Sequence, residues 1–241
     1  MEQHRNERKT LDRALSRAGS CSRTQASEWI RAGRVRVAGV VVLDPGRWVD
    51  PARDDIRLDG RPLRARTRIY LALHKPVGYL TSRGDPSGRR TVYDLVGDER
   101  AWVAPVGRLD RDTSGLLFLT NDTLWAERIT GPEHEVAKTY RAQVAPRIEE
   151  AALERLRAGL LLDDGPTRPA EARKLRDAGP TSIVELTITE GRNRQVRRMF
   201  RALGHRVRAL KRVAIGGVEL GELASGRVRP LTPAEVRRFR G

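Results

Sequence analysis

The stretch VGRLDRDTSGLLFLTND, residues 106–122, decides the fold because it joins a charged loop directly to an uninterrupted apolar run. The run Leu116–Leu119 is short, and it is bounded by Gly115 on one side and by Asn121 and Asp122 on the other. Such a pattern predicts a strand that is buried on both faces. A loop attached to a buried strand is held rigidly, so reactive side chains can be oriented there.

Asp110 is the acidic residue of this loop that we single out as a candidate for catalysis. Arg108 stands two residues before it and Arg111 follows it, so its surroundings are cationic and favour an ionised carboxylate. An aspartate that caps a turn or pairs with a surface arginine fits the same stretch. The neighbouring Asp112 and Asp122 are interpreted as turn residues. The rest of the chain has to decide between these interpretations.

The overall charge of the chain narrows the class of partner. The protein has 241 residues and a formal net charge of +16, and 32% of its residues are charged. This excess favours a polyphosphate partner, with an anionic membrane surface as the alternative. A membrane is disfavoured because the sequence has no apolar run of transmembrane length and opens without a signal-peptide pattern. We therefore expect a soluble, cytoplasmic protein that binds nucleic acid, and the single cysteine, Cys21, excludes an internal disulfide.

The N-terminal part of the chain predicts two short helices followed by a hairpin. A helical face begins at Leu11 behind a Thr10 cap, and Ser22 can cap a second helix. Strands at 35–37 and 40–42 then flank a short turn. Arginines occupy the exposed positions of these adjoining elements, which favours a phosphate-binding face over a merely solvated one. We assign RNA contacts here to Arg13, Arg17, Arg23, Arg34 and Arg36.

Strands and helices interleave along the remaining chain without regular beta-alpha-beta spacing. The expected strands span 69–73, 138–144, 183–188 and 207–215, and the expected helices span 124–129 and 147–158, with further helices near Gln195 and from Thr232. This order predicts an α+β domain with a mixed, mostly antiparallel sheet flanked by helices. The Gly-rich loop 81–90 fits either a flexible connection or a clamp that orders around RNA.

A second arginine cluster lies in the segment EGRNRQVRRM, residues 190–199, where Val196 and Met199 mark the apolar face of a helix. Arg194 and Arg197 fall at the start of this helix, where positive charge opposes the helix dipole. Their placement is explained if they meet an anion, which is either an RNA phosphate or a buried aspartate.

The first domain resembles the alpha-L RNA-binding domain of ribosomal small-subunit proteins and of several RNA-modifying enzymes. The resemblance rests on Leu11-x-x-x-Leu15-x-x-Ala18-Gly19, Ser22-Arg23 and Ile30-x-x-Gly33-x-Val35-x-Val37. The hairpin turn is Ala38-Gly39 where the family usually has Asn-Gly. The resulting organisation is an alpha-L domain over residues 8–60, a linker over 61–68 and a catalytic domain over 69–241.

The second domain resembles the bacterial ribosomal pseudouridine synthases that carry an N-terminal alpha-L domain. The resemblance rests on four segments in the family's order: Lys75-Pro76-x-Gly78, residues 107–122, Lys138-Thr139-Tyr140 and residues 190–199. It implies isomerisation of a uridine to pseudouridine in ribosomal RNA, with large-subunit RNA favoured by the intact Glu-Gly-Arg-Asn-Arg-Gln. The reaction needs neither a redox step nor an outside atom, so no cofactor is expected.

The resemblance also implies roles for individual residues. Asp110 matches the essential aspartate, and Arg197 matches the basic residue that pairs with it. Tyr140 matches the tyrosine that stacks on the target base, and Arg108 matches the arginine that fills the gap left by the flipped nucleotide. Judged by residues alone, Tyr140 fits a core position and Arg197 a phosphate contact. Further RNA contacts are assigned to Lys75, Arg192, Asn193, Arg194, Gln195 and Arg198.

Two other classes of protein fit part of the sequence. A non-catalytic factor for ribosome assembly explains the charge and the first domain, but not an aspartate between arginines on a rigid strand. A DNA-binding regulator is disfavoured because no helix-turn-helix register is evident. The histidines at 74, 134 and 205 are scattered and lack metal-ligand company. The expected partner is ribosomal RNA or a ribosomal precursor particle, with a monomer as the default and no metal.

Overall fold

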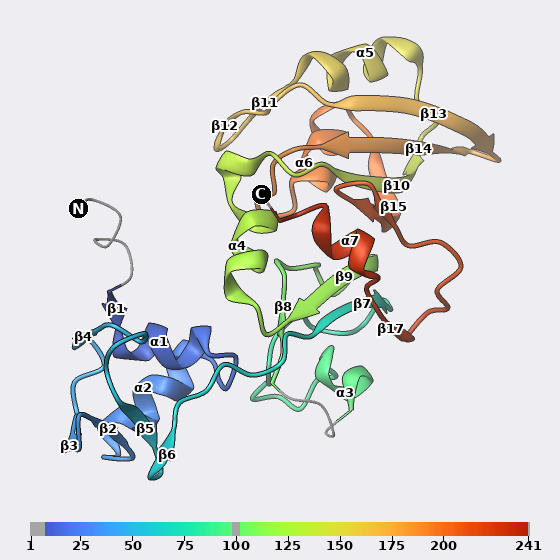
Figure 1. Cartoon of the computed structure of the whole chain (residues 1–241). Coiled ribbons are helices and arrows are strands. Elements are labelled where there is room, and N and C mark those ends of the chain that lie inside the picture. The colour runs from blue at the N-terminus through green and yellow to red at the C-terminus, as the bar shows by residue number, and fades with distance from the viewer. Residues whose placement is uncertain (1–7, 98–101, 241) are drawn as a thin grey trace. The chain divides into compact units, whose positions relative to one another are not determined.

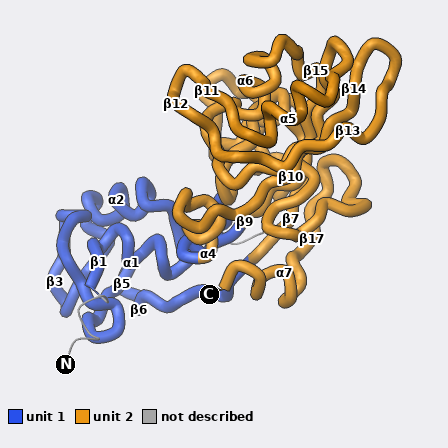
Figure 2. Tube along the Cα trace, turned by 90° about the horizontal axis from the view of Figure 1, so that it is seen from above, with its two compact units in different colours: residues 1–69, 99–104, 120–124 blue, residues 70–98, 105–119, 125–241 orange. Residues whose placement is uncertain are grey.

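The computed structural model describes residues 8–97 and 102–240, and the chain divides into two compact units (Figure 2). The first unit consists of residues 1–69, 99–104 and 120–124, and the second of residues 70–98, 105–119 and 125–241. Within the described residues, no helix is long and apolar enough to cross a membrane.

The first unit contains two helices and short strands, as the sequence predicts. Its elements are β1 (Lys9–Thr10), α1 (Leu11–Arg17), α2 (Arg23–Arg31), β2 (Val35–Val37), β3 (Val40–Val41), β4 (Trp48–Val49), β5 (Ile56–Leu58) and β6 (Arg61–Pro62). Strands β3, β2, β5 and β6 form one sheet in that order, so residues 61–62, expected in a linker, continue this sheet. The core is aliphatic and includes fully buried Leu11, Leu15, Ile30 and Val35.

Two local predictions in this unit have different outcomes. The hydroxyl of Ser22 accepts a hydrogen bond from the backbone N–H of Gln25 at 3.1 Å, so Ser22 caps α2 as expected. The Thr10 cap is wrong, because the Thr10 hydroxyl donates to the carboxylate of Asp12 and accepts no backbone N–H. Ala38 and Gly39 both adopt positive φ, of 49° and 79°, which a tight hairpin turn of this hand requires.

The second unit is built on a mixed sheet (Figure 1). The strand order is β13 (Glu171–Ala178), β14 (Thr181–Ile188), β10 (Lys138–Ala145), β15 (Arg206–Ile215), β9 (Ser114–Thr120), β7 (Tyr70–Lys75) and β17 (Val228–Pro230). The pairings from β13 to β15 and that of β7 with β17 are antiparallel, whereas β15 and β9 run parallel. Two short strands, β8 (Ala104–Pro105) and β16 (Val218–Glu219), extend this sheet. The prediction of an α+β fold with a mostly antiparallel sheet is confirmed.

The remaining elements are short helices around this sheet and one small hairpin. They are α3 (Tyr93–Val96), α4 (Thr123–Thr130), η1 (Pro132–His134), α5 (Glu150–Ala158), β11 (Leu161–Leu162), β12 (Gly165–Pro166), α6 (Gln195–Ala202) and α7 (Pro233–Arg237). Helix α5 packs on β13 and α6 packs on β15. An aromatic cluster of Phe118, Trp125 and Phe239 joins β9 to α4 and to the segment after α7, with ring centroids 5.4–6.0 Å apart.

Strand β9 is the buried centre of this unit. Residues 115–120 are all buried, which confirms the strand covered on both faces that the apolar run predicts. Gly115 has φ +112°, and a β-carbon there would lie 2.1 Å from the backbone oxygen of Arg212. Glycine is therefore required where β9 and β15 approach each other.

Candidate active site

The loop before β9 is fixed to the sheet by a buried lysine. Lys75 ends β7 and has no exposed surface, and its ammonium donates to the backbone oxygens of Pro76 (3.1 Å), Asp110 (3.0 Å) and Thr113 (2.8 Å). Burial lowers the pKa of Lys75 to about 8, although the nearby Asp110 and Asp112 oppose this shift. The RNA contact predicted for Lys75 is not supported, because RNA cannot reach a side chain that is wholly enclosed and already saturated with acceptors.

A second contact holds the same loop. The Thr81 hydroxyl donates to the backbone oxygen of Leu109 at 2.8 Å, and the N–H of Thr113 donates to the oxygen of Asp110 at 3.0 Å. Asp110 is therefore held in a tight turn, and its carboxylate stays about one-third exposed. A carboxylate that is rigidly placed but accessible can meet a substrate.

The direct ionic partner of Asp110 is Arg194, whose Nη1 lies 3.5 Å from Oδ2 of Asp110. The same guanidinium donates two hydrogen bonds to the carboxylate of Asp112, at 3.1 and 2.9 Å. This bidentate contact is the leading cause of a lowered pKa at Asp112. The interpretation of Asp112 as a plain turn residue is incomplete, because its carboxylate organises the arginine that contacts Asp110.

Arg197 lies beside this pair but contacts Asp112 and not Asp110. Its Nη2 donates to the backbone oxygen of Asp112 at 2.8 Å and lies 3.3 Å from the carboxylate of Asp112. Burial lowers the pKa of Arg197, and Asp112 and Asp110 oppose that shift. The prediction that Arg197 pairs directly with Asp110 is corrected to an electrostatic influence at longer range.

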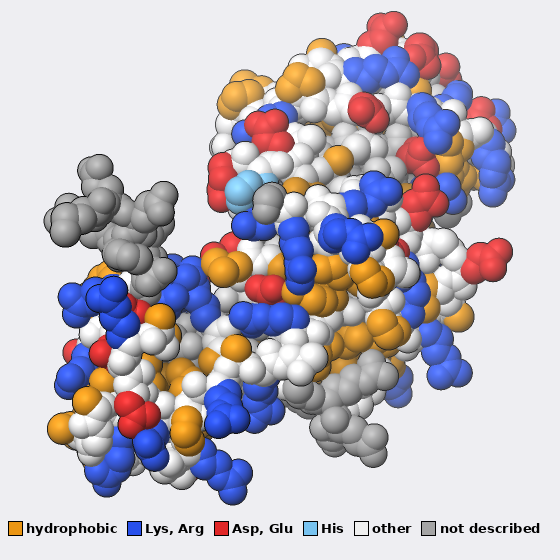
Figure 3. All heavy atoms as spheres, in the orientation of Figure 1, with side chains coloured by type: hydrophobic (Ala, Val, Ile, Leu, Met, Phe, Trp, Pro, Cys, Tyr) orange, Lys and Arg blue, Asp and Glu red, His pale blue; other side chains and the backbone are white. Residues whose placement is uncertain are grey.

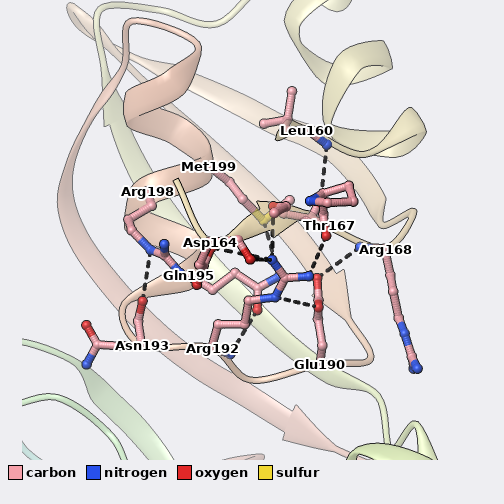
Figure 4. A network of polar contacts seen from close by, with 12 residues as sticks. Leu160, Asp164, Thr167, Arg168, Glu190, Arg192, Asn193, Gln195, Arg198 and Met199 are labelled. Atoms are coloured by element: carbon pink, nitrogen blue, oxygen red, sulfur yellow. Dashed lines mark hydrogen bonds and ion pairs between the residues drawn. The ribbon is translucent and has the colours of Figure 1, made fainter. Parts of the chain in front are cut away.

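The loop before α6 is pinned by a polar network around Glu190 (Figure 4). The guanidinium of Arg192 contacts Glu190, Asp164 and the backbone oxygens of Gly165 and Pro166. The amide of Gln195, only 3% exposed, donates to Glu190 and accepts the N–H of Arg192. These contacts show that Arg192 and Gln195 hold the loop, and the RNA contacts predicted for them stay predictions.

This network also explains how Arg194 reaches Asp110. Arg194 immediately precedes α6 and adopts the left-handed conformation, with φ 48° and ψ 30°, between two residues fixed by Glu190. A non-glycine residue in this region is held there by its surroundings. Arg198, one turn later, pairs with Asp164 at 2.7 Å, whereas Asn193 is exposed.

The other predicted site residues are placed as follows. Arg108 is exposed and has no ion pair or side-chain hydrogen bond within the described residues, so it is available to RNA. Tyr140 is 8% exposed and lies opposite Leu186 and Arg212 in the sheet. Its phenol makes no hydrogen bond to the part of the chain that the structure describes. Base stacking by Tyr140 therefore stays a prediction.

The arginines predicted to bind RNA in the first unit differ in availability. Arg23 pairs with Asp12 at 2.8 Å, Arg34 pairs with Asp59 at 2.6 Å and lies over the Trp29 ring, and Arg36 donates to the oxygen of Gly39. Arg13 is exposed and Arg17 is half-buried. The drawn face of each unit carries many basic side chains, with fewer acidic side chains among them (Figure 3).

Two adjoining pockets open beside the Asp110 loop. The larger has a volume of about 670 Å³ and is lined by Asp112, by arginines 194, 197, 198, 201 and 206, and by Asn193 and His205, among others. The smaller, of about 550 Å³, shares Asp112, Arg197 and Arg206 with the first and extends over β15 and β10. The site thus combines an accessible carboxylate, a guanidinium group beside it, and a cavity lined by several arginines.

Comparison with known proteins identifies the family at this point. Residues 69–202 match the model of the RNA pseudouridylate synthases, and residues 9–55 match that of the S4 domain. The chain belongs to the RNA pseudouridylate synthase family. The synthase model covers the Asp110 loop, β10 and the whole of α6, so each of the three predicted catalytic residues lies within the matched region.

Similar proteins match the synthase over nearly its whole length. It is 42% identical over 232 residues to "Ribosomal large subunit pseudouridine synthase B" of Bacillus subtilis (strain 168), covering 95% of each chain. It is 41% identical over 227 residues to "Uncharacterized RNA pseudouridine synthase" of Aquifex aeolicus (strain VF5), covering 94% of this chain and 91% of that one. A solved structure, "Crystal structure of pseudouridylate synthase", superposes with a TM-score of 0.70 at 36% identity, covering 95% and 99%. The predicted family is therefore confirmed.

Proposed function

We propose that this synthase isomerises a specific uridine of large-subunit ribosomal RNA to pseudouridine, with Asp110 as its essential carboxylate. The observation that carries the proposal is the placement of Asp110: its backbone is fixed by Lys75, its carboxylate lies 3.5 Å from Arg194, and the nearby Asp112 lines an arginine-rich pocket. The choice of large-subunit RNA draws on the similarity to the Bacillus subtilis enzyme.

The reaction breaks the bond between ribose and the ring nitrogen of uracil and forms a bond between the same ribose carbon and carbon 5 of the ring. Carbon 5 loses its proton and the released ring nitrogen gains one, so the product is an isomer of the substrate. Asp110 supplies the carboxylate that acts on the flipped nucleotide, as a nucleophile or a base. The guanidinium of Arg194 lies 3.5 Å away and places a positive charge beside this carboxylate. Tyr140 is proposed to stack on the uracil, and the free Arg108 to fill the gap in the RNA.

The first unit is proposed to supply affinity for structured RNA. Within the described residues Arg13 makes no ion pair and Arg36 contacts a backbone oxygen, so both can meet phosphates without breaking an ion pair there. The domains are proposed to divide near residues 60 and 69, with the synthase acting as a monomer. Free ribosomal RNA or a ribosomal precursor particle would then be its substrate in the cytoplasm.

The experiment combines chemical labelling of pseudouridine with two matched carboxyl-to-amide variants. The full-length protein is incubated with large-subunit ribosomal RNA transcribed in vitro. Pseudouridine is then located through the adduct that the chemical label forms with it. Asp110→Asn should abolish the product and retain RNA binding, while Glu154→Gln, at an exposed position on α5, should behave as the unmodified protein.

Product formation by Asp110→Asn would remove the catalytic assignment. RNA binding without any product from the unmodified protein would favour a non-catalytic assembly factor. Loss of one pseudouridine from the ribosomal RNA of a strain that lacks the gene would identify the modified position.

A further inference from the structure

One half of β15 forms an open edge beside the Asp110 loop. Along β15, the register pairs only Lys211 and Arg212 with β9, at Ser114 and Gly115, so residues 206–210 have no backbone partner on that side within the described chain. Side chains from the site cover this edge instead. Arg197 donates to the oxygen of Val207 at 3.3 Å, and Ser114 donates to that of Leu210 at 3.4 Å. The open edge therefore lines the smaller pocket, next to Asp112.

A β-bulge in the same half redirects an arginine. Gln143 of β10 lies opposite Ala209 and Val144 lies opposite Val207, so Arg208 has no residue opposite it. A bulge of this kind bends the strand and turns a side chain away from the regular alternation. Arg208 is exposed and lines the smaller pocket together with Arg206.

Three arginines of this region carry charge that nothing in the described chain neutralises. Arg201 on α6, Arg206 and Arg208 are exposed, and none of them makes an ion pair or a side-chain hydrogen bond with a described residue. By contrast, the other arginines of the larger pocket pair with Asp112 or Asp164. Arg201 lines the larger pocket, Arg208 the smaller, and Arg206 both, so the three form a continuous cationic surface.

We propose that Arg201, Arg206 and Arg208, here called the β15 arginine track, bind the phosphate backbone of the RNA strand that flanks the target nucleotide. This inference rests on the proposed function and adds the path of the strand to it. Unpaired guanidinium groups in a row fit a polyanion, and Arg206 shares its pockets with Asp112, the neighbour of the catalytic aspartate. Phosphate contacts of this kind position RNA without reading its sequence.

The test compares two triple variants of the full chain that remove the same number of charges. One is Arg201→Gln, Arg206→Gln, Arg208→Gln. The other is Arg128→Gln, Arg155→Gln, Arg237→Gln, whose arginines lie exposed on α4, α5 and α7 and also make no ion pair with described residues. Affinity for a large-subunit ribosomal RNA transcript is measured as a function of salt, and circular dichroism checks that both variants fold.

The track variant should lower the slope of log affinity against log salt by about 2, because each single-strand phosphate contact contributes about 0.7. The ratio of RNA affinities between the unmodified protein and the track variant should therefore fall by about 20-fold between about 50 and about 200 mM salt. The control variant should keep the original slope. Equal slopes for the two variants would overturn the proposal, since the track variant would then lose RNA affinity only because its net charge is lower.

The outcome is separable from that of the proposed function. Pseudouridine formation by the unmodified protein, together with equal slopes, would remove the track and leave the enzyme. A selective loss of slope in the track variant without any pseudouridine from the unmodified protein would retain the track as an RNA-binding surface and remove the proposed reaction.

Discussion

Arg194 lies 3.5 Å from Asp110 and is held there by two shorter hydrogen bonds to a different carboxylate, that of Asp112. One guanidinium thus serves two acids, with its firmest contacts made to the acid that is not proposed to react. This arrangement fixes the cation, while the carboxylate of Asp110 has a single ionic contact among the described residues. A carboxylate with few fixed bonds is freer to approach a substrate atom.

Arg194→Gln is expected to reduce turnover by about tenfold, equivalent to about 1.4 kcal/mol, because the cation that contacts Asp110 and holds Asp112 is lost. Turnover by Arg194→Lys should lie between that of Arg194→Gln and that of the unmodified protein, since lysine keeps the charge but cannot hold Asp112 with a bidentate contact. The measurement is single-turnover product formation at saturating RNA. Turnover by Arg194→Gln equal to that of the unmodified protein would show that the pair has no role in the reaction.

Lys75→Met is expected to lower the free energy of unfolding by about 3 kcal/mol, because three backbone oxygens lose their buried donor. Lys174→Met is the control, since Lys174 is exposed and, among the described residues, contacts one backbone oxygen and the carboxylate of Asp177. Urea unfolding of the full chain measures both. Similar losses in the two variants would mean that the buried contacts of Lys75 add nothing.

The stability contributed by Lys75 should also depend on pH. Its folded pKa is about 8 and its ordinary value is 10.5, so between these limits the unfolded chain binds a proton that the folded chain has released. Stability then rises with pH across this window. The difference in unfolding free energy between the unmodified protein and Lys75→Met should grow from about pH 8 to about pH 10.5. A difference that stays constant over this range would contradict the shifted pKa.

Gly115→Ala is expected to cost more than about 3 kcal/mol of stability, because the new β-carbon would meet the oxygen of Arg212 at 2.1 Å. Gly165→Ala provides a matched control: its φ of +104° is close to the +112° of Gly115, but no atom lies within 4 Å of the added carbon. The control should show the cost of backbone strain alone, about 1–3 kcal/mol. Equal urea-unfolding midpoints for Gly115→Ala and Gly165→Ala would exclude the steric explanation.

The sequence predicts the parts of this fold where periodicity and burial agree. Strand β9 was recognisable because its apolar run is unbroken, and α6 because Val196, Met199 and Phe200 repeat at helical spacing. Strand β13 was missed, since its eight residues are mostly charged and only Ala172 is buried. An edge strand with one covered position gives almost no alternating signal.

The site was predictable as a set of segments but not as a set of contacts. The sequence indicated that the arginines near 194 meet an anion, yet the partner of Asp110 depends on the left-handed backbone at Arg194, which no residue pattern specifies. Lys75 was assigned to RNA as part of a segment that resembles the family. Its burial follows from the packing of β7 against the Asp110 loop, a relationship between segments 35 residues apart.

The large sheet has two halves, which are joined where β9 and β15 run parallel. This pairing is short, because it consists of two residue pairs, at Ser114 and Gly115. Longer strand pairings stabilise each half of the sheet, so local opening of the structure should be most frequent at this short pairing. Amide hydrogens there should exchange sooner than those at the middle of β10, which has a strand on either side. The Asp110 loop, which precedes β9, and helix α6, which packs on β15, would then lie on opposite sides of the pairing that opens first.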